Sequence, residues 1–206
     1  MAITKVIAIR SRLDSRVNYV TNSKKTTLAA GLTYITNPEK TEQSFFVTAI
    51  NCGSPETAYR EMQQVKQRFH NTGGVLGYHF IQSFAPGEVT PEQAHRIGVA
   101  FAKEVFGDAY QVVVGTHLDR AHLHSHIIIN SVSFLDGKKY HSSPISYYNT
   151  IRKTSDELCK AENLSVLSPE SKGKHYAEWK AQQEGKPTLS QMLRDEIDLV
   201  IRDCFT

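Results

Sequence analysis

Short segments rich in apolar and β-branched residues recur along most of the chain, and in the first of them, residues 3–9, apolar and polar residues alternate. A period of two is typical of a strand that buries one of its faces. The last two of these segments are separated only by a tight turn at Arg120–Ala121. We therefore predict five strands, at residues 3–9, 43–52, 76–85, 110–119 and 122–134.

The residues between these segments show helical spacing together with helix start and stop signals. Ser54 is the predicted N-cap of a helix that ends at Gly73–Gly74, and Thr90 is the predicted N-cap of a second helix. Further helices are predicted at 13–21, 28–36 and 144–162. This order of elements predicts an α+β fold, a largely antiparallel five-stranded sheet with flanking helices.

The chain becomes more polar after about residue 165, and a final apolar stripe with helical spacing follows at 188–206. We expect a core domain at 1–165 and a C-terminal helical extension at 166–206. The sequence stops abruptly within that last element, which suggests a fragment of a longer protein.

The composition indicates an ordinary soluble protein that works in a reducing compartment. The 206 residues carry a net charge of +3, which only weakly favours a polyanionic partner. The three cysteines are scattered and form no CxxC pair. The chain lacks a secretory signal and any run near the ~20 apolar residues needed to span a bilayer. We therefore expect a cytoplasmic protein that does not insert into membranes.

Histidines gather in one short segment, H-L-D-R-A-H-L-H-S-H, which begins at His117. Residues two apart in a strand share a face, about 6.5–7 Å from one another. His124 and His126 can therefore converge on one ion, and His117 can face them from the preceding strand. Three imidazoles with open positions suit a borderline divalent cation that acts as a Lewis acid. Asp119 is close enough in the sequence to orient one imidazole.

The alternative interpretation is a polar strand face that happens to carry histidines, which their alternating spacing disfavours. His122, at the mouth of the strand, can be a ligand, a group that orients a ligand or a DNA contact. Histidines alone do not name a reaction, because a hydrolase, an oxygenase or a nuclease would use them equally well.

The chain also repeats one short pattern, VNYVTNSKKT around Tyr19 and LTYITNPEKT around Tyr34. A phosphodiester polarised by a metal ion needs a nucleophile. If that nucleophile is a tyrosine hydroxyl, the phosphate stays on the protein as a covalent ester, and a later strand end can reverse the step. The alternative for each tyrosine is a half-buried residue that anchors a helix to the core.

These repeats resemble a known family when they are taken together with YHFIQSFAPGEVTPEQAHRIG, THLDRAHLHSHIIINSVSF and TSDELC. About residues 1–165 resemble the relaxase domain of plasmid and transposon mobilisation proteins. The match is closest to the MobP-class, MobA/MobL-like members of the histidine-hydrophobic-histidine (HUH) endonucleases. Ser125 departs from the pattern, which has an apolar residue there, but we expect this side chain to point away from the metal.

The resemblance implies that His117, His124 and His126 are the metal ligands and that a tyrosine after the first strand is the nucleophile. It implies a metal-dependent, site- and strand-specific DNA relaxase that nicks an origin of transfer. Such an enzyme stays attached to the 5′ phosphate and later rejoins the ends. The expected cofactor is Mn²⁺ or Mg²⁺, with Zn²⁺ or Ni²⁺ as alternatives. Single-stranded DNA is the expected partner, and accessory relaxosome proteins and a coupling protein are further candidates.

Tyr19 follows the first strand at the family's usual distance from the N-terminus, whereas Tyr34 precedes the second strand at its usual distance. An insertion or duplication of 15 residues explains both, and we favour Tyr19. Between the two copies, Lys25 can touch a phosphate or lie in a solvated loop. His79, in a strand expected to neighbour the histidine strand, can approach the metal or be an ordinary sheet histidine. Asn130 can contact DNA or only cap the sheet.

Two rival functions stay open at this point. One is a rolling-circle replication initiator, which uses the same nicking chemistry in a different role. The other is a non-catalytic DNA-binding module whose histidines hold a structural metal. Metal removal separates the second rival from a relaxase, because a closed structural site ties folding to the metal and an open catalytic site does not.

Overall fold

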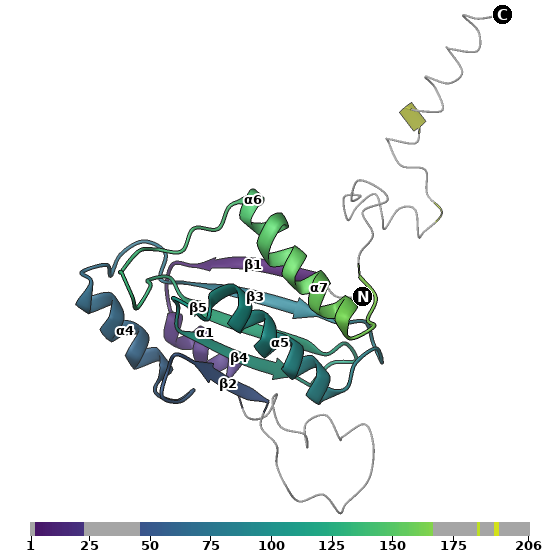
Figure 1. Cartoon of the computed structure of the whole chain (residues 1–206), viewed down its shortest axis with the longest axis horizontal. Helices are drawn as coiled ribbons and strands as arrows, with labels where there is room; N and C mark the ends of the chain where they lie inside the picture. Colours follow the sequence, from purple (N-terminus) through teal and green to yellow (C-terminus); the bar gives the residue numbers. More distant parts are fainter. Residues whose placement is uncertain (1–2, 23–45, 167–184, 186–191, 194–206) are drawn as a thin grey trace, which may run out of the picture. The chain divides into compact units, whose positions relative to one another are not determined.

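The computed structural model of the chain describes residues 3–22, 46–166, 185 and 192–193 (Figure 1). The chain divides into two compact units, Met1–Leu167 and Ser168–Thr206, and the fold given below is that of the first. The predicted helix at 28–36, which contains Tyr34, lies outside the described residues, as do Lys25 and most of the predicted extension at 166–206.

Five strands form one antiparallel sheet in the described part of the chain, in the order β1-β3-β5-β4-β2. Each strand falls within the range predicted for it, so the predicted fold class is confirmed. The histidine-bearing strand β5 lies in the middle of the sheet, between β3 and β4. The strands are β1 (Ile3–Ile9), β2 (Val47–Ile50), β3 (Gly77–Ser83), β4 (Val112–His117) and β5 (His124–Asn130).

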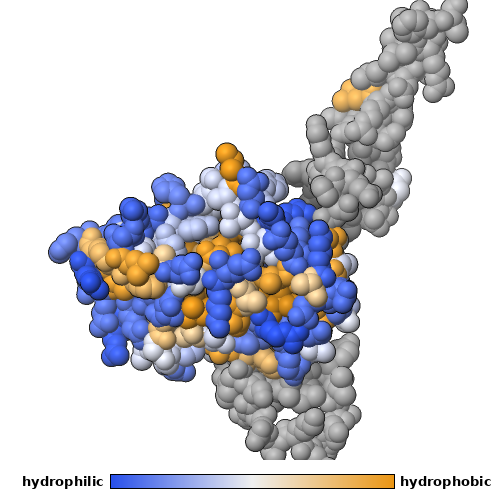
Figure 2. All heavy atoms as spheres, viewed as in Figure 1, coloured by the Kyte–Doolittle hydropathy of each residue, from blue (hydrophilic) through white to orange (hydrophobic). Residues whose placement is uncertain are grey.

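One face of the sheet is covered by α5 and by a second, composite helix (Figure 1). The composite helix consists of α6 (Pro144–Ser146), the π-helical turn η1 (Tyr147–Arg152) and α7 (Lys153–Ala161). Helix α5 (Pro91–Phe106) begins with the predicted N-cap, because the Thr90 side chain accepts a hydrogen bond from Gln93 N in a capping box. Hydrophilic side chains surround and interrupt the apolar area on this side of the molecule (Figure 2).

The opposite face of the sheet is covered by α1 (Leu13–Val20) and α4 (Ala58–Arg68). An eight-residue helix such as α1 is too short to be stable alone. It is held by three buried side chains, each of which contributes roughly 1.5–3 kcal/mol on full burial. These anchors are Leu13, Val17 and Val20, which pack against β4 and β5 through Val113 and Ile128.

Two helices differ from their prediction. Helix α4 begins at Ala58 rather than just after Ser54, because Ser54 and Thr57 bond each other in a separate turn that precedes the helix. It also ends at Arg68, before the predicted end at Gly73–Gly74. The predicted helix at 144–162 is present, but it contains the π-helical turn η1. There Tyr147 turns towards the edge strand β1, where its hydroxyl donates to Thr4 O at 2.6 Å.

Candidate metal centre

Three histidines converge at one end of the sheet, on the face that α1 covers. His117 ends β4 and pairs with His124 at the start of β5, and His126 follows two residues later. One ring nitrogen from each of the three lies within 4.8 Å of the others. His117 and His126 are buried, and His124 is partly exposed. This geometry brings together the three residues that the sequence singled out.

The donor set fits a borderline divalent cation. Ligating nitrogens lie 2.0–2.1 Å from such an ion, so two of them are separated by about 3–3.5 Å around it. The largest observed separation, 4.8 Å, therefore has to shorten by about 1.3–1.8 Å when an ion binds. Such a shift is within the reach of side-chain rotation, because the three rings already contact one another, with centroids 4.3–5.4 Å apart.

Hydrogen bonds orient the two histidines of β5. His124 Nδ1 lies 3.1 Å from the backbone oxygen of His122, and since a carbonyl oxygen only accepts, Nδ1 carries the proton and Nε2 is the nitrogen left to bind an ion. His126 Nδ1 lies 2.7 Å from Nε2 of His79, a buried residue on β3. Burial, followed by the nearby charges of Arg16, His117 and Lys5, lowers the pKa of His79 to about 4.

Tyr19 lies against the trio. Its ring makes edge contacts with the rings of His117 and His126, at centroid distances of 5.1 and 5.3 Å. The residue is 39% exposed, so part of its surface is open to a large substrate. The anchors of α1 flank Tyr19 in the sequence, because Val17 and Val20 are both buried. The packing of α1 on the sheet therefore fixes where this phenol lies.

Gly115 makes the close approach of α1 possible. It lies on β4, two residues before His117 and on the same face. A Cβ atom at this position would lie 2.2 Å from the backbone oxygen of Val20 and 2.8 Å from its Cγ1. Only glycine therefore lets the last turn of α1, which carries Tyr19, rest directly on the strand that carries His117.

Arg16 is a residue of this region that the sequence reasoning missed. It is exposed and lies three residues before Tyr19, and residues at this spacing share one side of a helix. Its guanidinium is close enough to contribute to the low pKa of His79, after the larger effect of burial. The spacing of Arg16 and Tyr19 on a predicted helix was the signal that could have found it.

The other predicted site residues fall into two groups. Asp119 and His122 are exposed in the segment between β4 and β5, next to the trio, and the His122 ring lies 5.3 Å from that of His124. Asn130 is different, because it lies at the far end of β5 and is fully buried. Its amide donates to Met62 O and Gln111 Oε1, and its oxygen accepts from Lys66 Nζ.

These contacts favour the interpretation of Asn130 as a residue that caps the sheet rather than one that meets DNA. Its partner Lys66 is also fully buried, and burial lowers the pKa of the Lys66 amine to about 8. A buried ammonium needs acceptors, and the Asn130 oxygen supplies one of them. This network therefore holds α4 on the sheet, away from the histidines.

Ser125 points to the opposite face, as expected from its position between the two ligand candidates of β5. Its hydroxyl lies 2.9 Å from Thr116 Oγ1 and donates to Ala94 O at 3.2 Å. Thr116 Oγ1 in turn lies 3.0 Å from His95 Nδ1. A polar side chain is thus accommodated in place of an apolar one, because it is hydrogen-bonded behind the histidine strand.

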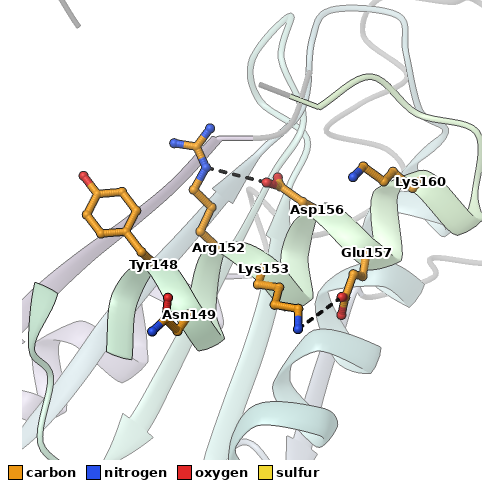
Figure 3. A pocket seen from close by; sticks show the side chains of 7 residues that line it. All are labelled: Tyr148, Asn149, Arg152, Lys153, Asp156, Glu157 and Lys160. Carbon is orange, nitrogen blue, oxygen red and sulfur yellow. Dashed lines mark ion pairs between the residues drawn. The ribbon is translucent and has the colours of Figure 1, made fainter. Parts of the chain in front are cut away.

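A charged groove runs along η1 and α7 (Figure 3), on the face of the sheet opposite the trio. Its basic residues are largely paired within the helix, since Arg152 lies 3.6 Å from Asp156 and Lys153 lies 3.8 Å from Glu157. These i,i+4 pairs offset the charges of the two basic residues that they include. We therefore take the three histidines, rather than this groove, as the candidate functional site.

A five-stranded antiparallel sheet that presents three convergent histidines beside a tyrosine defines a protein of the HUH endonuclease class. Residues 34–164 match the model of the family "Relaxase: MobA/VirD2-like, nuclease domain". The chain belongs to this relaxase family, which confirms the resemblance found in the sequence. No helix in the described part of the chain is both long and apolar enough to cross a membrane.

Two curated proteins are similar to this chain over most of its length. The chain is 36% identical over 154 residues to a "Protein rlx" of Staphylococcus aureus, which covers 73% of this chain and 45% of that protein. It is 28% identical over 242 aligned positions to the "Group II intron-interrupted relaxase LtrB" of Lactococcus lactis subsp. cremoris, covering 94% of this chain and 43% of that protein. The chain thus spans less than half the length of these relatives.

A solved structure shares the fold. It was described under the heading "Molecular Basis of Vancomycin Resistance Transfer in Staphylococcus aureus" and superposes with a TM-score of 0.52. The superposition covers 84% of this chain and all of the other, at 10% sequence identity. At that identity the likeness shows the fold alone.

Proposed function

We propose that the chain is the nicking domain of a DNA relaxase that uses Tyr19 as its nucleophile and a divalent cation held by His117, His124 and His126. The observation that carries the proposal is the contact of the Tyr19 ring with two of these three histidines. A phenol and a metal centre have to meet at one phosphodiester for this chemistry, and here they are neighbours. The substrate is single-stranded DNA at an origin of transfer.

The step exchanges one phosphodiester for another. The Tyr19 oxygen forms a bond to the 5′ phosphate, the bond to the 3′ oxygen of the preceding nucleotide breaks, and that oxygen leaves as the 3′ hydroxyl. His117, His124 and His126 would hold the cation, which would supply charge neutralisation at the scissile phosphate. We assign to Asp119 the acceptance of the phenolic proton or the orientation of a histidine ligand, and to His122 a contact with DNA. Attack by the 3′ end of a strand on the phosphotyrosine reverses the step and rejoins the DNA.

Tyr34 is the competing nucleophile. The family match begins at residue 34, so it includes Tyr34 and leaves out Tyr19. The support for Tyr19 is physical, because its ring contacts the trio, whereas Tyr34 lies outside the described residues. Lys25, between the two tyrosines, is proposed to contact a phosphate. The choice between the tyrosines is tested in the Discussion.

Metal removal tests the proposal. The full chain, incubated with an origin-of-transfer oligonucleotide and Mn²⁺ or Mg²⁺, is expected to form a protein–DNA adduct that survives a denaturing gel. EDTA is expected to abolish the adduct while the circular dichroism spectrum stays that of the folded protein, because three ligands leave open positions at a catalytic centre. Unfolding by EDTA without any adduct in the presence of metal would instead indicate the non-catalytic module with a structural site.

The cell biology follows from the same proposal. A nicking domain that spans less than half the length of its relatives is proposed to work as part of a longer protein in the cytoplasm. Accessory relaxosome proteins and a coupling protein are the proposed partners, since an origin has to be melted before a single strand can enter the site.

Arg16 is expected to bind a phosphate of the DNA strand close to the scissile one. Its exposed guanidinium on the Tyr19 side of α1 suits this role, because planar guanidinium groups match phosphate oxygens. We expect Arg16→Ala to weaken binding of the oligonucleotide about tenfold and to reduce the salt dependence by roughly one phosphate contact, as measured by fluorescence anisotropy. Arg12→Ala is the control, because Arg12 starts the same helix but pairs with Asp14. Equal losses in the two variants would contradict the role of Arg16.

A further inference from the structure

We propose that His79 is a positioning residue that accepts a hydrogen bond from His126 and thereby holds the Nε2 atom of His126 towards the metal ion. This inference rests on the proposed function, since it assumes that the trio holds a cation. It assigns a role to a histidine that is not itself one of the three ligands and that belongs to a different strand.

The geometry of the pair is that of a short, buried hydrogen bond. His79 Nε2 and His126 Nδ1 are 2.7 Å apart, and the two ring centroids are 4.8 Å apart. In the register of β3 and β5, His79 faces Ile128 and Ile81 faces His126, so the two histidines are diagonal neighbours on one face. Each residue is only 4% exposed, so the hydrogen bond between them is shielded from bulk water.

The chemistry decides which ring donates. A ligating nitrogen has no proton, and a neutral imidazole carries one N–H group on its other nitrogen. If His126 binds the ion through Nε2, its Nδ1 atom carries the proton and donates it. His79 Nε2 is then the acceptor, and the His79 proton resides on its own Nδ1. A protonated His79 would donate instead and would place a second cation next to the ion.

The second ligand on β5 provides an internal comparison. His124 Nδ1 has the backbone oxygen of His122 as its partner, which any residue at position 122 supplies. The Nδ1 atom of His126 instead has a side chain of the neighbouring strand, that of His79, as its hydrogen-bond partner. Of these two ligands, only His126 can therefore lose its orienting partner through a single substitution elsewhere in the chain. Removal of such a partner typically costs 10–100-fold in metal affinity.

The test measures metal binding by the full chain without DNA. Mn²⁺ affinity is followed by calorimetry or electron paramagnetic resonance in His79→Leu, which fills the space without an acceptor, and in His79→Gln, whose side-chain oxygen can accept the bond. We expect Mn²⁺ binding to weaken at least tenfold in His79→Leu and to stay within threefold of the wild type in His79→Gln. His95→Leu is the matched control, because it removes a histidine of helix α5, which covers the opposite face of the sheet, and this histidine bonds Thr48 and Thr116 rather than the trio.

A spectroscopic measurement adds a readout that a general loss of packing would not move. In ¹⁵N-histidine spectra of the protein loaded with diamagnetic Zn²⁺, the wild type is expected to show His126 protonated at Nδ1 and His79 protonated at Nδ1. Protonation of His79 at Nε2, or binding of Mn²⁺ by His79→Leu within threefold of the wild type, would overturn the inference. Weakening in His95→Leu as large as that in His79→Leu would overturn it too.

The inference and the proposed function fail in different ways. A wild-type chain that binds Mn²⁺ and responds to the His79 substitutions, but forms no adduct with any oligonucleotide, would refute nicking and leave the role of His79 intact. A wild-type chain that binds neither Mn²⁺ nor Zn²⁺ would refute the metal centre and the role of His79 together.

Discussion

Tyr19→Phe is expected to abolish the covalent protein–DNA adduct, with a loss of at least about 10³-fold in the rate of its formation. The substitution removes the one oxygen atom that forms the new bond to phosphorus, and no neighbouring group in the trio can replace it. Because the ring is kept, its edge contacts with His117 and His126 are kept as well. The measurement is a time course of adduct formation on a denaturing gel at saturating Mn²⁺.

Two controls separate the loss of a nucleophile from a loss of structure. The unfolding free energy and the Mn²⁺ affinity of Tyr19→Phe should match the wild type within about 1 kcal/mol and threefold, since the substitution keeps the ring and removes one oxygen atom from a partly exposed residue. Tyr34→Phe is the matched variant from the second copy of the repeat, and we expect it to form the adduct at the wild-type rate. If Tyr19→Phe still forms the adduct and Tyr34→Phe does not, the nucleophile is the tyrosine of the second copy.

The sheet was predictable because its signal is local. The alternation of apolar and polar residues in β1 and the unbroken apolar run Ile127–Ile129 of β5 required no knowledge of the rest of the chain. The start of α5 was predictable from a local signal as well, because Thr90 is its N-cap residue and forms a capping box. Local signals misled at Ser54, because a hydroxyl that can cap a helix can equally bond a turn that precedes one.

The candidate site was only partly predictable, because its geometry depends on which elements lie side by side. The spacing of His124 and His126 placed them on one face, and the tight turn brought His117 to them. Neither spacing nor composition could show that α1 covers this face or that Tyr19 touches the trio. That result depends on the long-range packing of Val17 and Val20 on the sheet.

The roles of His79 and Asn130 illustrate the same limit. Both were candidates because of their strand positions, and the difference between them appears only in the register of the sheet. His79 lies diagonally next to His126. Asn130 lies on the same strand as His126 but at its other end, which is buried under α4. A shared strand face therefore selects residues for a site, and distance along the strand decides which of them reach it.

Gly115→Ala is expected to increase the distance between the Tyr19 phenol and the three histidines without removing either of them. The added Cβ would lie 2.2 Å from the backbone oxygen of Val20, far inside contact distance, so the last turn of α1 has to move away from β4. Overpacking of this kind typically costs 1–3 kcal/mol of stability. A displacement of about 1 Å between reacting groups can lower a rate about 10²-fold. We therefore expect adduct formation to fall by about that factor.

A displacement of α1 should leave the metal centre itself unchanged, and this can be measured. Mn²⁺ affinity is expected to stay within threefold of the wild type, because the clash presses on α1 rather than on the histidine side chains. Gly107→Ala serves as the control, since its Cβ would meet Lys103 O at 2.5 Å at the end of α5, away from the trio. If Gly107→Ala loses as much stability and as much adduct as Gly115→Ala, the effect is one of folding. A loss of adduct confined to Gly115→Ala means that one missing methyl group sets the distance between phenol and metal.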